Sequence, residues 1–255
     1  MQKIFDAHFH IIDPEFPLKE NNGFLPDPYT IEQYHEECQS FPLEFVGGAV
    51  VSGSFQGYDQ SYFDTALSGL GSGYVGITQL PVSATDTEIL ELNKIGIKGI
   101  RFNLYRGLNT SLEDIKLLAN RVYELAGWGT EFYLNLKEAD SDLKNLIFRL
   151  PKTSIDHMGM TIVPVSELCR FLAQDVRIRV SGFGRIGYDR FQVEKLLPTL
   201  YQENPHGLMF GTDLPATRAK YRFSMADIQL IQEALSNDSD AIDNVLYRNA
   251  QDWYL

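Results

Sequence analysis

The chain has 255 residues, of which 44% are hydrophobic and 22% are charged, a balance that is typical of a folded globular protein and excludes a disordered chain. Its 22 Lys and Arg residues and 34 Asp and Glu residues leave a formal net charge of −12, which argues against nucleic acid or an anionic membrane as a partner because both are polyanions. We expect a soluble, cytoplasmic protein, because no segment has the apolar length of a signal peptide or a membrane span and the two cysteines lack a CxxC spacing.

Eight short segments rich in β-branched and aromatic residues are predicted as strands. In chain order they are residues 3–8, 45–52, 74–80, 97–104, 131–136, 153–159, 176–182 and 208–214. Between them lie segments with the periodicity of helices, clearest at 111–127, where Ser111 can cap the first turn. Further helices are predicted from Val163-Pro164 onward and at 188–201, 225–236 and 242–253, with Pro198 expected to kink the helix at 188–201.

Strands that alternate with helices eight times in ~250 residues are typical of a (β/α)8 TIM barrel. A doubly wound open sheet has the same alternation, so the number of strands decides between the two folds. No Gly/Ser-rich linker or block of charge divides the chain, and residues 1–255 are therefore predicted to form one domain. The longest irregular segment, 11–28, would lie over the active-site face of a barrel, and together with the loop at 101–111 it is expected to set the specificity.

Three of the five histidines and one aspartate fall at the predicted carboxyl ends of strands, where barrels place catalytic groups. His8 and His10 alternate at the end of the first strand, so they are expected to point together into the barrel mouth and could bind a metal or surround a substrate carbonyl. His157 ends the sixth strand and Asp213 the eighth. Taken singly, His157 could be a core histidine and Asp213 a helix cap, but their joint position favours a functional site.

Arginines form a second set at the same end of the predicted barrel. Arg101 and Arg106 follow the fourth strand, and Arg185 follows the seventh. Each could pair with an acidic side chain, or present its planar fork to a carboxylate or phosphate of a substrate. The second interpretation explains how an acidic protein could bind a small anionic substrate, which is the partner that we expect.

Two glycine-rich patterns resemble a dinucleotide-binding loop. The GxGxxG at 71–76 follows a predicted helix and precedes a strand, which is the wrong order for such a loop. The GxGxxG at 182–187 has the right order, but Phe183 and Arg185 crowd it. A nicotinamide-dependent oxidoreductase is therefore the weaker alternative, and the absence of GxSxG, Walker A and HExxH patterns leaves serine-hydrolase, P-loop and zincin functions without support.

An ordered set of motifs spans nearly the whole chain: DAHFH at 6–10, GIRFN at 99–103, IDHMG at 155–159, VSG at 180–182, GTDLP at 211–215 and Asn249-Ala250. Together they resemble the amidohydrolase-related family of the amidohydrolase superfamily, in the group of pyrone dicarboxylate and sugar-acid lactonases. The resemblance implies a (β/α)8 barrel that hydrolyses a lactone or similar ester. It implies the following roles: a base, Asp213; groups that orient and polarise the carbonyl, His8, His10 and His157; and contacts to the substrate anions, Arg101, Arg106 and Arg185.

The sequence departs from the superfamily pattern where a binuclear metal site would need its ligands. The fourth strand offers Arg101 in place of a bridging lysine, and the fifth ends in Asn135-Leu136-Lys137 without a histidine. We therefore expect that no cofactor is required. The alternative is one divalent ion, Zn or Mn, held by His8, His10 and Asp213, with or without His157.

Two further functions stay open at this stage. With one metal ion, the protein could be a mononuclear hydrolase or a decarboxylase of the aminocarboxymuconate-semialdehyde type. A barrel that binds a sugar acid without turnover is the non-enzymatic alternative. The substrate itself is left open, because Ala216 stands where close relatives of the lactonase carry a histidine.

Overall fold

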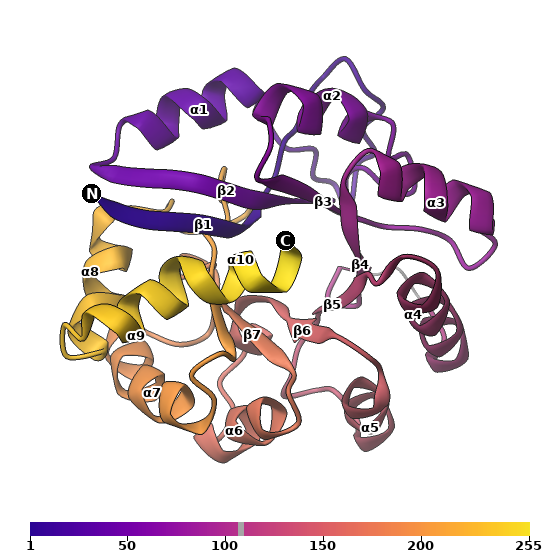
Figure 1. Ribbon diagram of the computed structural model, residues 1–255. Coiled ribbons are helices and arrows are strands. Elements are labelled where there is room, and N and C mark those ends of the chain that lie inside the picture. Colours follow the sequence, from indigo (N-terminus) through magenta and orange to yellow (C-terminus); the bar gives the residue numbers. More distant parts are fainter. Residues whose placement is uncertain (107–109) are drawn as a thin grey trace.

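The computed structural model describes residues 1–106 and 110–255 and has the predicted (β/α)8 barrel architecture (Figure 1). Parallel strands pair in sequence order from β1 to β8. Their bounds are β1 (Gln2–Phe9), β2 (Leu43–Val51), β3 (Tyr74–Thr78), β4 (Ile97–Asn103), β5 (Gly129–Tyr133), β6 (Thr153–Ile155), β7 (Arg177–Val180) and β8 (Leu208–Phe210). The expected specificity loop at 101–111 includes residues 107–109, which lie outside the described residues.

Helices surround the strands in the order of the chain (Figure 1). Their bounds are α1 (Ile31–Gln39), α2 (Tyr62–Leu70), α3 (Asp86–Lys94), α4 (Leu112–Ala126), α5 (Ser141–Arg149), α6 (Val165–Ala173), α7 (Arg190–Glu203), α8 (Met225–Ala234), α9 (Ser239–Asp243) and α10 (Asn249–Tyr254). Two further segments complete the set. The turn η1 (Asp156–Gly159) contains residues with left-handed backbone angles, and η2 (Asn244–Arg248) is a π-helical turn.

Several predicted helix ends agree with the structure, and others differ for identifiable reasons. Helix α4 begins after Ser111, whose hydroxyl accepts the Asp114 N–H at 3.1 Å, and it ends at the left-handed Gly127. Pro164 is the capping residue of α6 and not part of its first turn. Pro198 lies inside α7, which continues beyond it. The predicted helix at 242–253 is part of one longer helical run formed by α9, η2 and α10.

The predicted strands at 131–136, 153–159, 176–182 and 208–214 extend too far. Beyond Ile155, Val180 and Phe210 the chain reaches residues with left-handed backbone angles, including His157 at φ 50°, Gly182 at φ 66° and Asp213 at φ 58°. Such angles cannot continue a strand. The motif residues therefore lie in turns directly after the last buried apolar residue of each strand, where their side chains face the barrel mouth.

Backbone hydrogen bonds just beyond the strand ends join β1 to the segment after β8. The Asp213 N–H donates to the His8 carbonyl and the His10 N–H donates to the Leu214 carbonyl, each at 2.8 Å. A Cβ on Gly211 would lie 2.7 Å from the Cβ of His8, so only glycine permits this approach. These contacts close the barrel between β1 and the segment after β8, and this closure places Asp213 next to the two histidines of the first strand.

The buried Asp6 carboxylate supports the same closure. It accepts hydrogen bonds from the Thr212 N–H at 2.8 Å and the Thr212 hydroxyl at 2.6 Å, and the Tyr34 hydroxyl donates to it at 3.2 Å. Four polar partners, with the His8 N–H as the fourth, offset the cost of burying this side chain. Asp6 is therefore a structural residue, although it belongs to the same motif as the two histidines.

The opposite end of the barrel is covered by α10, which crosses it in Figure 1. The ring of Tyr254 stacks on Phe5 with centroids 5.9 Å apart, and Trp253 packs over Gly129, the first residue of β5. This end is closed by packed aromatic side chains. The carboxyl ends of the strands are thus the face on which a substrate can approach.

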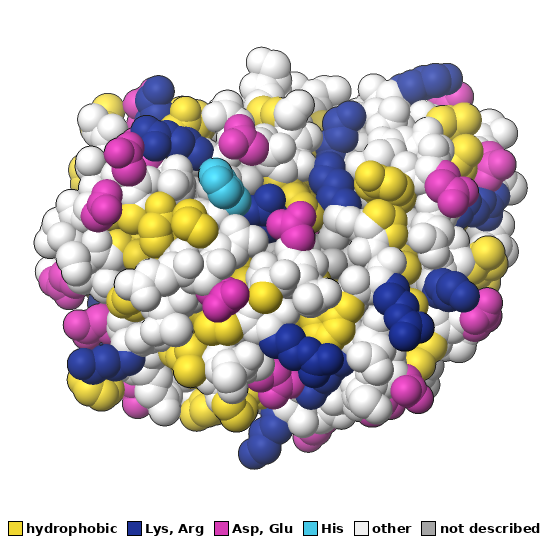
Figure 2. Space-filling model, turned by 60° about the horizontal axis from the view of Figure 1, so that its bottom comes forward, with side chains coloured by type: hydrophobic (Ala, Val, Ile, Leu, Met, Phe, Trp, Pro, Cys, Tyr) yellow, Lys and Arg dark blue, Asp and Glu magenta, His cyan; other side chains and the backbone are white. Residues whose placement is uncertain are grey.

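The outer surface mixes charges of both signs. On the face drawn in Figure 2, acidic and basic side chains are interspersed with apolar patches. Within the described ranges, no helix combines the length and the apolarity that crossing a membrane would require.

Candidate active site

Three imidazole rings converge on one carboxylate oxygen at the barrel mouth. The Nε2 atoms of His8, His10 and His157 each lie 3.7 Å from Oδ1 of Asp213. All four side chains are buried. The structure therefore brings together the histidines and the aspartate that the sequence placed on separate strands.

Small residues around His157 fix its ring. The hydroxyl of Ser181 lies 2.9 Å from Nδ1 of His157, and a Cβ on Gly182 would lie only 2.6 Å from the same atom. His157 and Asp213 both have positive φ, which is uncommon for residues other than glycine and is found at functional sites. The VSG motif at 180–182 thus serves to seat the His157 ring against its neighbours.

The tautomer of His10 follows from its contact with Val51. Nδ1 of His10 lies 2.6 Å from the Val51 carbonyl oxygen, which can only accept a hydrogen bond. Nδ1 therefore carries a proton, and in neutral His10 the lone pair of Nε2 faces Asp213. Nε2 of His8 and Nε2 of His157 have no hydrogen-bond partner among the described residues. These three nitrogens and the carboxylate oxygen can together orient a water molecule or a polarised carbonyl.

The surroundings of the histidines and of Asp213 shift their pKa values, so that the imidazoles and the carboxylate differ in charge. Burial lowers the pKa of His8 to about 4, although nearby Asp156 opposes the shift, and burial likewise holds the pKa of His157 well below its usual range. Burial opposes ionisation of Asp213, but the guanidinium of Arg185, at 3.1 Å, holds its pKa well below the ordinary value. Near pH 7 the site therefore combines neutral imidazoles His8 and His157 with an ionised Asp213.

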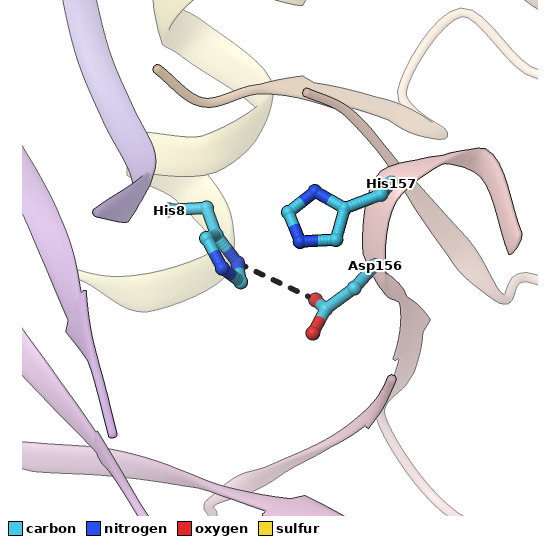
Figure 3. A group of neighbouring side chains, drawn as sticks. All are labelled: His8, Asp156 and His157. Carbon is cyan, nitrogen blue, oxygen red and sulfur yellow. Dashed lines mark ion pairs between the residues drawn. The ribbon is translucent and has the colours of Figure 1, made fainter. Parts of the chain in front are cut away.

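A second carboxylate, Asp156, lies behind His8. Figure 3 shows its contact with the His8 ring, in which Nδ1 lies 3.5 Å from Oδ1 of Asp156, and the His157 ring beside them. Arg101 donates from Nε to Asp156 Oδ2 at 2.8 Å, and Arg179 donates from Nη1 to Oδ1 at 2.9 Å. The two guanidinium groups keep the pKa of Asp156 well below its usual range despite its burial. Asp156 is thus placed to orient His8, a role that the sequence interpretation did not assign.

The network continues into the barrel interior through Arg179, which is fully buried on β7. Its guanidinium also contacts the Glu131 carboxylate and the Tyr254 hydroxyl, and the Tyr254 hydroxyl donates to Glu131 at 2.6 Å. A buried arginine needs such partners because an unpaired charge there would be strongly destabilising. Arg179 lies between Ile178 and Val180 on β7, and Glu131 directly precedes Phe132 on β5. A charged residue inside a buried strand is the signal by which the sequence could have revealed them.

The mouth above this cluster is lined by arginines. Arg101, Arg106 and Arg185, all predicted, line one cavity together with Arg218, which sequence reasoning missed. The Tyr133 ring lies between two of them, 4.6 Å from the Arg101 guanidinium and 5.4 Å from that of Arg185. Arg185 donates to the Tyr133 hydroxyl at 2.7 Å. Tyr133 ends β5, and its place at a strand end could have pointed to it.

The predicted metal ligands form a compatible donor set. One ligand atom from each of His8, His10 and Asp213 lies within 4.8 Å of the others, and His8, Asp156 and His157 form a second such group. Imidazole nitrogen and carboxylate oxygen suit zinc or manganese. Each carboxylate, however, already has an arginine partner, Arg185 for Asp213 and Arg101 for Asp156. These donors fit one metal ion, but the two arginines already neutralise the carboxylates without it.

Comparisons with known proteins show which hydrolases the chain is similar to. The chain is 25% identical to a 2-pyrone-4,6-dicarboxylate hydrolase of Comamonas testosteroni, over 84% of this chain and 77% of that one. It is 24% identical to a 4-sulfomuconolactone hydrolase of Hydrogenophaga intermedia, over 83% of this chain and 74% of that one. The resemblance to the amidohydrolase-related lactone hydrolases is confirmed. No protein-family model matches the chain.

Solved structures related to these lactone hydrolases share the fold. A probable 2-pyrone-4,6-dicarboxylic acid hydrolase of Acinetobacter baumannii, solved with citric acid, superposes with a TM-score of 0.80 at 21% identity and covers 98% of both chains. A putative hydrolase of the same kind from Pseudomonas putida has a TM-score of 0.79 at 20% identity, over 98% of this chain and 97% of that one. The predicted (β/α)8 barrel is therefore the fold that these solved structures share.

Proposed function

We propose that this protein hydrolyses the ester bond of a lactone that carries anionic groups, with Asp213 activating the attacking water. The convergence of three imidazole Nε2 atoms on Asp213 beneath an arginine-lined mouth carries the proposal. The curated relatives support it, because their names describe hydrolases of a pyrone dicarboxylate and of a sulfonated lactone. Both of those compounds are small cyclic esters with negative charge, which suits a cationic mouth.

The proposed reaction needs one water and no other co-reactant. Oδ1 of Asp213 accepts a proton as the water oxygen bonds to the lactone carbonyl carbon. His8, His10 and His157 surround this point. The Nε2 lone pair of His10 can accept a hydrogen bond from the water, and His8 and His157, in the tautomer that carries Nε2–H, can donate to the carbonyl oxygen as it becomes negative. The bond between the carbonyl carbon and the ring oxygen then breaks, and Asp213 returns the proton to the departing oxygen. The product is the open-chain hydroxy acid or its tautomer.

Substrate binding would also make Asp213 a stronger base. In the present structure Arg185 donates to both carboxylate oxygens, at 3.3 and 3.1 Å, which weakens the affinity of Asp213 for a proton. A substrate carboxylate that binds Arg185 would share this guanidinium and reduce its hold on Asp213. Arg101 and Arg106 are the other proposed anion contacts. Arg101 would hold the substrate beside His8, and Arg106 would hold it at the rim.

We propose that this chemistry proceeds without a required cofactor, and one divalent ion is the alternative. His8, His10 and Asp213 would hold such an ion. A zinc or manganese ion would polarise the carbonyl and lower the pKa of water. The arginine partners of both carboxylates support the proposal without metal. A cytoplasmic location is proposed as well, because Cys38 and Cys169 are both free.

The deciding experiment measures ring opening with 2-pyrone-4,6-dicarboxylate, 4-sulfomuconolactone and an uncharged lactone, with chelator-treated and zinc-supplemented protein. We expect turnover of a charged lactone at equal rates in both preparations. Asp213→Asn is expected to lower kcat by about 10²- to 10⁴-fold while the thermal midpoint stays close to that of the native protein. Wild-type rates in Asp213→Asn, or no ring opening by the native protein, would reject the proposal. Activity that appears only with added ion would select the metal alternative.

A further inference from the structure

The irregular segment 11–28 carries a tight hairpin tip that reaches the barrel mouth. Asn21 and Phe24 pair in antiparallel fashion, with the Asn21 N–H donating to the Phe24 carbonyl at 2.9 Å and the reverse hydrogen bond at 3.1 Å. Between them, Asn22 and Gly23 have φ of 51° and 73°, the signature of a two-residue type I′ turn. The Phe24 side chain lines the mouth cavity. The hairpin tip therefore forms part of the wall of the candidate site.

Arg218 is bound to this hairpin tip by two kinds of contact. Its Nη2 donates to the Asn21 carbonyl at 2.5 Å, and its guanidinium lies 4.2 Å from the centroid of the Phe24 ring. The side-chain amide of Asn21 in turn donates to the Arg106 carbonyl at 3.2 Å. One asparagine thus joins three loops of the mouth, those that follow β1, β4 and β8.

The pairing of charges at the mouth leaves two guanidinium groups without a carboxylate. Arg101 is paired with Asp156 and Arg185 with Asp213. In the described part of the chain, neither Arg106 nor Arg218 forms an ion pair with an acidic side chain, and no Asp or Glu lines the cavity that they share. Two like charges held at one cavity repel each other, and an anion between them would relieve that repulsion.

We propose that Arg218 is a specificity-determining residue, which binds the substrate's second anionic group, the one held away from the ester bond that is cleaved. The Asn21 carbonyl and the Phe24 ring keep its guanidinium over the mouth, where it acts together with Arg106. The inference rests on the proposed lactone hydrolysis and deepens it, because it makes the substrate a lactone with at least two anionic groups. One group binds near Arg101 and Arg185 and the other at the rim.

The test compares substrates that differ in one anionic group. For native protein and Arg218→Gln, kcat and KM are measured with 2-pyrone-4,6-dicarboxylate and with each of the two pyrone monocarboxylates. We expect KM for the dicarboxylate to rise about 10- to 100-fold in Arg218→Gln, the usual effect of losing a charge-assisted hydrogen bond, with kcat changed less than about threefold. KM for the monocarboxylate that lacks the rim group should stay unchanged.

The matched control is Arg248→Gln, which removes one positive charge from an ion pair with the exposed Asp240, in the helical run of α9 and η2. It should leave the kinetic constants of all these substrates unchanged. An equal effect of Arg218→Gln on every substrate, or a loss confined to kcat, would overturn the assignment and indicate a structural role for Arg218.

A binding measurement separates this inference from the proposed hydrolysis. Calorimetry with pyridine-2,4-dicarboxylate, a planar diacid without an ester, is compared with the two pyridine monocarboxylates. We expect the diacid to bind native protein at least ten times more tightly than either monoacid, and Arg218→Gln to remove that preference. If the native protein opens no lactone but shows this preference, the hydrolysis is wrong and the role of Arg218 stands. If it opens lactones without the preference, the role of Arg218 is wrong.

Discussion

At the scale of single residues, the site contrasts two kinds of arginine. Arg185 is buried and bound to Asp213 and Tyr133, so it is part of the charge balance of the folded protein. Arg106 lies at the rim, 5.0 Å from the ring of its neighbour Tyr105, without a carboxylate partner in the described ranges. The first should therefore contribute to stability as well as to catalysis, and the second to substrate binding alone.

This contrast predicts different consequences for two matched substitutions. Arg185→Met leaves the Asp213 carboxylate buried without its partner, which is expected to lower the free energy of unfolding by roughly 3 to 5 kcal/mol and to lower kcat. Arg106→Met breaks no ion pair, so it should change the free energy of unfolding by less than about 0.5 kcal/mol and raise KM. Urea unfolding and steady-state kinetics of both variants check this, and equal stability of the two would contradict it.

At the scale of elements, the strands position the site through the turns that follow them. Asp213 and His157 owe their direction to left-handed backbone angles directly after β8 and β6. The ordered motifs predicted which residues meet, but the alternation used to place them assumed strands that continue through 159 and 214. Turn geometry depends on contacts from other strands, such as the hydrogen bond between Asp213 and His8, and a single segment of sequence does not contain that information.

The hairpin tip offers a test at this scale. Gly23 has φ 73°, and no atom lies within 4 Å of the position that a Cβ would take, so Gly23→Ala meets a backbone cost of ~1 kcal/mol without a steric clash. Because Asn21 and Phe24 hold Arg218, loosening the turn should raise KM for a dianionic lactone several-fold. Gly71→Ala is the control, since Gly71 also has positive φ and open space but ends α2. Equal KM in the two variants would refute the role of the tip.

At the scale of the whole molecule, the fold could be predicted from the sequence, because short apolar strands alternate with helices eight times along the chain. The residues of the candidate site could be predicted only in part. His8, His10, His157 and Asp213 could be named because they end strands, and all strand ends of a parallel barrel meet on one face. Arg218 could not, because it comes from a loop. Its position depends on a hairpin far away in the chain, with Asn21 and Arg218 separated by 197 positions.

The burial of neutral histidines makes the stability of the whole molecule depend on pH. Burial lowers the pKa of His8 from 6.5 to about 4, so between these values the unfolded chain binds more protons and the free energy of unfolding falls as the pH falls. His8 alone should remove about 3 kcal/mol between pH 7 and pH 4, and His157 acts in the same direction. Urea unfolding of chelator-treated protein measures this, with His8→Gln expected to flatten the dependence and His206→Gln, at an exposed loop, to leave it unchanged. Burial raises the pKa of Asp6 and of Glu131 to about 7, and these two carboxyl groups act in the opposite direction. The test is therefore the difference between the native protein and His8→Gln, and equal slopes of the two between pH 7 and pH 4 would contradict the neutral state of His8.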